Sequence, residues 1–191
     1  MADAALATAS APTYLPPHEL DGRALVDGGV FAANPSIAAI AEALKRRSDA
    51  PAGLGLDDLF VVSLGTGYYP AKYAPRVLRG WGGLAWIQPR GSEPALMRAM
   101  LDGQTVSADH WAHTLLNAEH RDPQLQRNEL GRGPRYWRIE SELGADIELD
   151  DARTGTLDAL ANEANARIEE RSDDLDRIAQ ALTAAGPIEG A

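Results

Sequence analysis

One uninterrupted apolar segment limits the folds open to this chain more than any other feature. Residues 59–64 read Leu-Phe-Val-Val-Ser-Leu, with no alternation of apolar and polar side chains, and Gly65-Thr66-Gly67 ends the run. That pattern is typical of a strand buried on both faces, in a parallel sheet with helices above and below it. A shorter run, Ala24-Leu25-Val26, predicts an earlier strand that stops at a tight turn, Asp27-Gly28-Gly29.

The sequence predicts a helix between these two strands. Asn34 can cap the helix, Pro35 supplies a preset φ at its first position, and apolar residues follow at helical spacing up to Leu44. Strand, helix and strand together predict a βαβ unit of a three-layer α/β fold with a mainly parallel sheet. Farther along we expect helices over 94–101, 106–117, 156–171 and 172–182, a short strand over 136–139, and a frayed tail over 183–191.

Composition and charge narrow the class of protein. At 191 residues, 45% of them hydrophobic, the chain fits a single domain. It has no cysteine, which excludes disulfides and thiolate zinc sites and fits a reducing cytoplasm. No apolar stretch is long enough to span a bilayer, and residues 1–4 lack a signal peptide's basic flank. The net charge of −10 arises between Glu140 and Asp176, and this acidic balance disfavours nucleic acid as a partner.

The strongest candidate for chemistry is Asp27. An acid at the carboxyl end of a strand lies where open α/β sheets keep their active sites, and the two following glycines let the backbone turn sharply. A carboxylate there can orient or deprotonate a nucleophile. On the residues alone, an Asp-Gly-Gly sequence is more often a simple turn.

A second candidate is the segment 68–91, which is rich in aromatic residues and carries positive charges without an acid. Aromatic side chains favour the boundary between water and lipid, and basic groups favour anionic headgroups. We therefore consider an interfacial lip that admits lipid and contacts a membrane peripherally; the alternative is a loop whose tryptophans pack on the core. The residues singled out for this lip are Arg76, Arg79, Trp81 and Trp86.

Other nucleophile and metal candidates are weaker. Ser36 and Ser63 lack the surroundings of a nucleophilic serine, although a triad of a serine, one of the four histidines and Asp27 remains an alternative. His110 and His113, with Asp109 beside them, could supply two metal ligands from one helix. With no third ligand evident, we expect no metal and no cofactor.

Several motifs together resemble the patatin-like phospholipases in order and spacing, over about residues 7–182. The resemblance covers residues 7–17, Leu25 to Pro35 with the Asp-Gly-Gly turn, and Val61 to Gly67. It continues in residues 101–104, 136–139 and 169–172. The chain is therefore similar to the C-terminal portion of a single patatin-like domain.

The resemblance implies a lipid acyl hydrolase that works with a Ser–Asp dyad. The family's serine sits on a Gly-x-Ser-x-Gly elbow, a glycine-rich loop forms the oxyanion hole, and the family's acid maps onto Asp27, with Gly28 and Gly29 as its supporting turn. No Gly-x-Ser-x-Gly occurs in these 191 residues, and no glycine-rich loop precedes Asp27. We expect both elements upstream, and a chain that is catalytically silent by itself.

Three functions stay open at this point. The chain contributes Asp27 to the hydrolysis of acyl esters, together with an upstream half or a homologous chain. Alternatively, it is a non-catalytic module that binds lipid or protein, or a degenerate remnant. An incomplete sheet leaves strand edges and apolar faces open, so we expect the isolated chain to bind a partner, to oligomerise or to be marginally stable.

Overall fold

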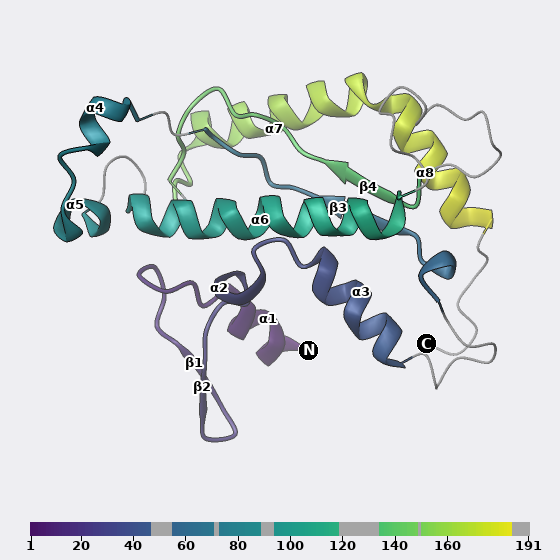
Figure 1. Cartoon of the computed structure of the whole chain (residues 1–191), viewed down its shortest axis with the longest axis horizontal. Helices are drawn as coiled ribbons and strands as arrows, with labels where there is room; N and C mark the ends of the chain where they lie inside the picture. Colours follow the sequence, from purple (N-terminus) through teal and green to yellow (C-terminus); the bar gives the residue numbers. More distant parts are fainter. Residues whose placement is uncertain (47–54, 71–72, 89–93, 119–133, 149, 185–191) are drawn as a thin grey trace. The chain divides into compact units, whose positions relative to one another are not determined.

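The computed structural model (Figure 1) describes residues 1–46, 55–70, 73–88, 94–118, 134–148 and 150–184. The fold is α/β and represents part of a domain. It divides into two compact units, one formed by residues 1–64 and 72–139 and the other by residues 65–71 and 140–191. We describe each unit by itself.

The first unit is built around one long helix, α6 (Ala95–Leu116), which packs on α2 (Gly29–Ala32), α3 (Ser36–Lys45) and β4 (Tyr136–Ile139) (Figure 1). The core lies between α3, α6 and the strands, where Ile40, Ala112, Leu116 and Tyr136 are buried. Two helices were expected over 94–101 and 106–117. One forms instead, because the packing of α6 outweighs the cost of about 1 kcal/mol for a glycine, Gly103, in its interior.

The expected βαβ unit exists, but between other strands. β3 (Val61–Leu64) pairs in parallel with β4, with Val61 opposite Tyr136, and α6 lies in the crossover between them. The predicted βαβ unit of strands 24–26 and 59–64 is wrong, because these strands lie in different sheets. β2 (Arg23–Leu25) instead pairs antiparallel with β1 (His18–Leu20). β3 is also less buried than expected, since Leu64 is 69% exposed.

The hairpin of β1 and β2 has a local cause. Leu20 pairs with Arg23 across a two-residue loop, in which Asp21 has φ 51° and Gly22 has φ 71°. Two consecutive left-handed residues match the twist of antiparallel strands, and Asp-Gly is a preferred sequence for this turn. The N-terminal segment begins with a helix, α1 (Ala2–Ala9).

Side chains complete the hydrogen bonds of β4. The buried Asn117 side chain donates to the Tyr136 carbonyl and accepts from the backbone N–H groups of Arg135 and Tyr136. The Arg135 guanidinium donates to the carbonyls of Leu116 and Leu56. These contacts fasten the start of β4 to the end of α6 and to the short 3-10 helix Leu56–Asp58 that precedes β3.

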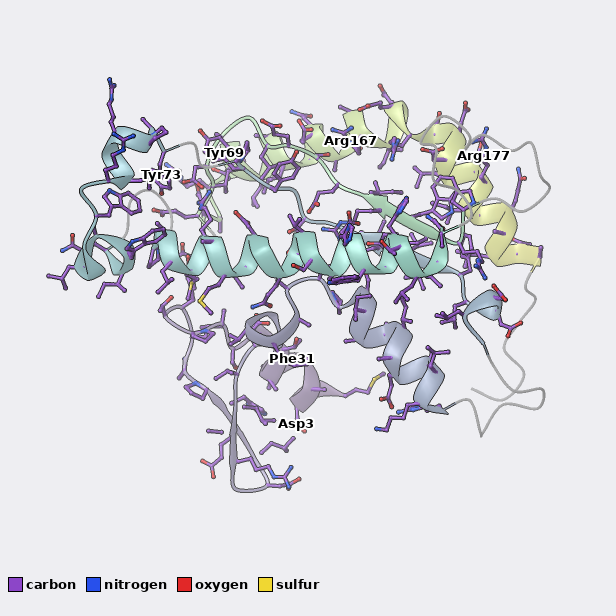
Figure 2. The ribbon with its side chains drawn as sticks, in the orientation of Figure 1. Asp3, Phe31, Tyr69, Tyr73, Arg167 and Arg177 are labelled. Atoms are coloured by element: carbon purple, nitrogen blue, oxygen red, sulfur yellow. The ribbon has the colours of Figure 1, made fainter. Side chains whose placement is uncertain are left out.

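In the second unit, Tyr68 forms an isolated parallel bridge with Glu142, and Gly67, at φ 95°, lies against Leu143. The Arg167 guanidinium, labelled in Figure 2, donates from α7 (Thr154–Glu170) to the Ser141 hydroxyl at 2.8 Å. The predicted helices over 156–171 and 172–182 are confirmed as α7 and α8 (Ser172–Ala184), and so is the strand over 136–139. Most of the expected frayed tail lies outside the described residues.

Candidate active site

Asp27 lies two residues after the end of β2, at the start of the short helix α2. Its backbone N–H donates to the carbonyl of Ser10 at 2.9 Å, and its own carbonyl accepts from the Val30 N–H at 3.2 Å. Ser10 is buried, and its hydroxyl donates to the Leu6 carbonyl of α1. The N-terminal segment and the Asp-Gly-Gly segment, two of the motifs in the sequence, are therefore hydrogen-bonded to each other at this aspartate.

The half-buried carboxylate of Asp27 has one oxygen fixed and one open. Oδ1 accepts a hydrogen bond of 2.6 Å from the Gly29 N–H. Within the described ranges, Oδ2 accepts no hydrogen bond. The Gly29 N–H belongs to the first turn of α2, where backbone N–H groups lack helical partners and favour a negative charge. The predicted tight turn is thus a helix entrance that orients the carboxylate.

The two glycines act differently. Gly28 has ordinary right-handed angles, φ −61° and ψ −18°, and a Cβ there would lie 3.9 Å from the Thr8 hydroxyl, an ordinary contact. A Cβ on Gly29 would lie 3.1 Å from Oδ1 of Asp27, which is too close without a shift. Gly29 is therefore the glycine that the carboxylate itself requires.

Gln104 holds this region onto α6, a role that the sequence did not suggest. Its side-chain Nε2 donates to the Val30 carbonyl at 3.2 Å, and its Oε1 accepts from the Ala33 N–H at 3.3 Å. One amide thus bridges both ends of the segment that follows Asp27. The sequence Asp102-Gly103-Gln104 is one of the resemblance motifs, and this contact gives its glutamine a structural purpose.

The serine candidates Ser36 and Ser63 lie in a buried polar network. Asn34 Oδ1 accepts from the backbone N–H and the hydroxyl of Ser36, and Arg138 donates to the Ser63 hydroxyl at 2.7 Å. Ser36 is 5% and Ser63 is 7% exposed. Neither has a histidine as a hydrogen-bond partner among the described residues, and His120 lies outside them. The predicted cap is displaced by one residue: Pro35 is the N-cap of α3, and Asn34, before it, accepts from the N–H of the first helical residue, Ser36.

Next to this network, the buried hydroxyl of Tyr136 donates to the carboxylate of Asp109 at 2.8 Å. Burial raises the pKa of Tyr136, because the phenolate would lose its hydration. The Asp109 bond also stabilises the neutral phenol. Asp109 therefore accepts a structural hydrogen bond. Among the described residues no group of three histidine or acidic side chains gathers to hold a metal, and the His110 ring stacks edge-on against Trp111.

The lip contains two short helices, α4 (Pro75–Leu78) with Arg76 and α5 (Gly83–Ile87) with Trp86. Arg79 is the C-cap of α4, and Trp81 lies between the helices. Trp81 is half-buried between Tyr73 and Trp86, with ring centroids 5.0 and 5.1 Å away. Arg76 and Arg79 are exposed. The aromatic residues thus pack on one another. The apolar surface offered to solvent includes Leu84 at 72%, Ile87 at 54%, Val77 at 45%, and Leu78 and Trp86 at 37% exposure.

No helix in the described part of the chain is long and apolar enough to cross a membrane. Contact of the lip with a membrane surface does not require a spanning helix and depends on the exposed side chains of the lip.

Comparison with known proteins agrees with the motifs. The patatin-like phospholipase family profile matches residues 1–40, which contain Asp27 and its three hydrogen-bond partners, Ser10, Gly29 and Val30. Patatin-like protein 2 of Arabidopsis thaliana is 32% identical over 185 residues, covering 84% of this chain and 41% of the relative. A cGAMP-activated phospholipase of Vibrio cholerae is 30% identical over 163 residues, covering 84% of this chain and 43% of the relative.

A shorter match joins the chain to a plant protein named as probably inactive. Probable inactive patatin-3-Kuras 1 of Solanum tuberosum is 33% identical over 106 residues, covering 47% of this chain and 28% of the relative. No solved structure matches the chain. The chain spans about two fifths of the length of the first two relatives. Over that span, it belongs to the patatin-like phospholipase family.

Proposed function

We propose that this chain supplies the general base, Asp27, of a lipid acyl hydrolase with a Ser–Asp dyad. The observation that carries the proposal is the asymmetry of the carboxylate. Oδ1 is held by the Gly29 N–H at 2.6 Å, whereas Oδ2 is open within the described ranges. A base must be fixed in direction and must still have a lone pair free for the incoming proton.

The chemistry follows from that arrangement. Oδ2 takes the proton of a serine hydroxyl as the serine oxygen attacks the ester carbonyl, and it gives that proton to the alkoxide oxygen, so that the alcohol leaves and an acyl-serine forms. The carboxylate, ionised again, then takes a proton from the water that attacks the acyl-serine and returns it to the serine oxygen as the fatty acid is released. The serine comes from residues outside these 191, since the chain contains no Gly-x-Ser-x-Gly. The family resemblance supports this assignment.

The test joins the chain to the preceding segment of Patatin-like protein 2, which we expect to carry the serine elbow, and measures hydrolysis of nitrophenyl butyrate. Asp27→Asn keeps the shape of the side chain and removes the base, so kcat should fall by about 10²–10⁴-fold. Asp21→Asn, in the nearby hairpin loop, is the matched control and should keep full activity. Equal rates for both variants, or Asp27-dependent turnover by the unjoined chain, contradict the proposal.

A second candidate function, a module that binds lipid surfaces, is supported by the lip alone. Leu84 and Ile87 are exposed beside the exposed guanidinium groups of Arg76 and Arg79. Such a surface can insert apolar side chains while its cations contact anionic headgroups. It requires no catalysis.

Flotation with vesicles of phosphatidylglycerol and phosphatidylcholine tests this second function. The wild type should float with anionic vesicles, and Arg76→Glu/Arg79→Glu should remain at the bottom of the gradient. Arg23→Glu, an equal kind of charge change on β2, is the control and should float. Trp81→Ala/Trp86→Ala tests the aromatic residues in the same assay. Equal flotation of wild type and lip variants removes the idea.

A further inference from the structure

An apolar groove connects the segment after Asp27 with the lip. It lies within the first unit, has a volume of about 280 Å³, and is lined by residues that include Val30, Ile87, Met97, Met100 and Leu101. Val30 is three residues from Asp27 and bonds to its carbonyl, and Ile87 is the last residue of α5 in the lip. One groove therefore reaches both the segment after Asp27 and the lip.

The groove offers an almost purely apolar lining. Its polar side chain is Gln104, whose two amide atoms are both engaged with the backbone at Val30 and Ala33. A ligand in the groove thus finds few hydrogen-bond partners, apart from those at its Asp27 end. The chemistry of such a site fits a hydrocarbon chain with a polar group at one terminus.

We infer that this groove binds the acyl chain of the substrate, with the ester at the Val30 end and the methyl terminus towards Ile87. The inference rests on the proposed function of Asp27 for its orientation. An apolar cavity of about 150 Å³ holds a benzene ring, so this volume accommodates on the order of ten carbon atoms. The chain-length preference that follows is about C8 to C12.

Binding to the 191-residue chain is measurable without catalysis. The probe is cis-parinaric acid, a fluorescent fatty acid, displaced by hexanoate, octanoate, decanoate and tetradecanoate. Affinity should rise by about two- to fourfold per methylene until the groove is filled, and then stay level. A rise that continues unchanged to tetradecanoate indicates non-specific adsorption and overturns the proposal.

Two substitutions test the location. Met97→Trp places a larger side chain in the groove and should weaken decanoate binding at least tenfold. Met100→Glu places a charge at its rim, where Met100 is 58% exposed, and keeps the test valid if Met97→Trp fails to fold. Val106→Trp, on the same helix and outside the groove, is the matched control and should bind as the wild type does. Wild-type binding by a folded groove variant overturns the proposal.

A separate measurement tests the orientation of the acyl chain in the groove. It also distinguishes failure of this inference from failure of the proposed function. A carboxylate head beside Asp27 meets a like charge, so Asp27→Asn should strengthen binding of decanoate several-fold and leave that of decanol unchanged. If Asp27→Asn leaves the ratio of decanoate affinity to decanol affinity unchanged, the proposed orientation is overturned. The catalytic role of Asp27 fails separately, if hydrolysis by the joined enzyme survives Asp27→Asn while both ligands still bind.

Other occupants of the groove give different results. A second copy of the chain is indicated by concentration-dependent mass in sedimentation that Met97→Trp abolishes. The remaining polypeptide is indicated if the joined enzyme no longer binds parinarate. Either result overturns the acyl-chain assignment.

Discussion

The adjacent glycines after Asp27 allow a stringent test of how the carboxylate is held. In Gly28→Ala the new methyl group lies 3.9 Å from the Thr8 hydroxyl, and the right-handed backbone accepts alanine. In Gly29→Ala the methyl group lies 3.1 Å from Oδ1 and 3.7 Å from Cγ of Asp27. The first substitution therefore leaves the carboxylate in place, whereas the second displaces it.

The size of the effect follows from the displacement. Relief of the 3.1 Å contact moves Oδ1 by a few tenths of an ångström and disturbs its 2.6 Å bond to the Gly29 N–H. Because a misplacement of about 1 Å costs about 10²-fold in rate, a shift of a few tenths costs about fivefold. Gly28→Ala should match the wild type in rate and gain about 0.4–1 kcal/mol of stability from a less flexible unfolded chain.

The assay is kcat for nitrophenyl butyrate with the joined enzyme, together with thermal melting of each variant by circular dichroism. We expect kcat to be the same for the wild type and Gly28→Ala, lower for Gly29→Ala and lowest for Asp27→Asn. The two alanine variants should have comparable melting temperatures. Equal rates for Gly28→Ala and Gly29→Ala would refute the reasoning, because the two changes differ in whether they touch the carboxylate.

Three further predictions concern stability, measured by urea unfolding. Gly67→Ala should lower the free energy of unfolding by about 2–5 kcal/mol, because φ is 95° and the new Cβ would meet a Leu143 carbon at 2.7 Å. The control, Gly82→Ala, has open space around it and should change the free energy of unfolding by less than about 1 kcal/mol. Asn117→Ala removes three hydrogen bonds to the start of β4 and should cost about 2–4 kcal/mol. Burial raises the pKa of Tyr136, so the unfolded chain releases this proton first and stability should fall above about pH 10; Tyr136→Phe should flatten that decline.

The parts of the fold that local chemistry decides could be predicted from the sequence. α3 begins two residues after Asn34, whose side chain accepts from the Ser36 N–H, and α8 begins at Ser172. Short polar residues are favoured at such helix starts. The position of Asp27 after a strand was also predictable, since the apolar run that ends at Val26 is followed by Asp27 and two glycines. The hairpin before it had a signal too, the Asp21-Gly22 pair, which favours a two-residue loop.

The pairing of strands and the support of the site were not predictable in this way. β3 pairs with β4 across more than 70 residues of chain, and no local pattern specifies which of two short apolar runs becomes its neighbour. The bonds from Gln104 to Val30 and Ala33 span a similar separation. A glutamine on a helix ordinarily faces solvent, so its sequence context gives no sign of the contact.

The surroundings of Asp27 connect completion of the site with burial of apolar surface. Val26 and Phe31 flank the aspartate and are 44% and 84% exposed (Figure 2 labels Phe31). A carboxylate that takes a proton directly from a serine needs partial desolvation, because water stabilises its charged form and weakens it as a base. Whatever polypeptide covers these two side chains removes apolar area from water and dries the carboxylate in the same step. Within the proposed dyad, assembly of the site and activation of its base are therefore one event, and the stability gained from apolar burial offsets the cost of desolvating Asp27.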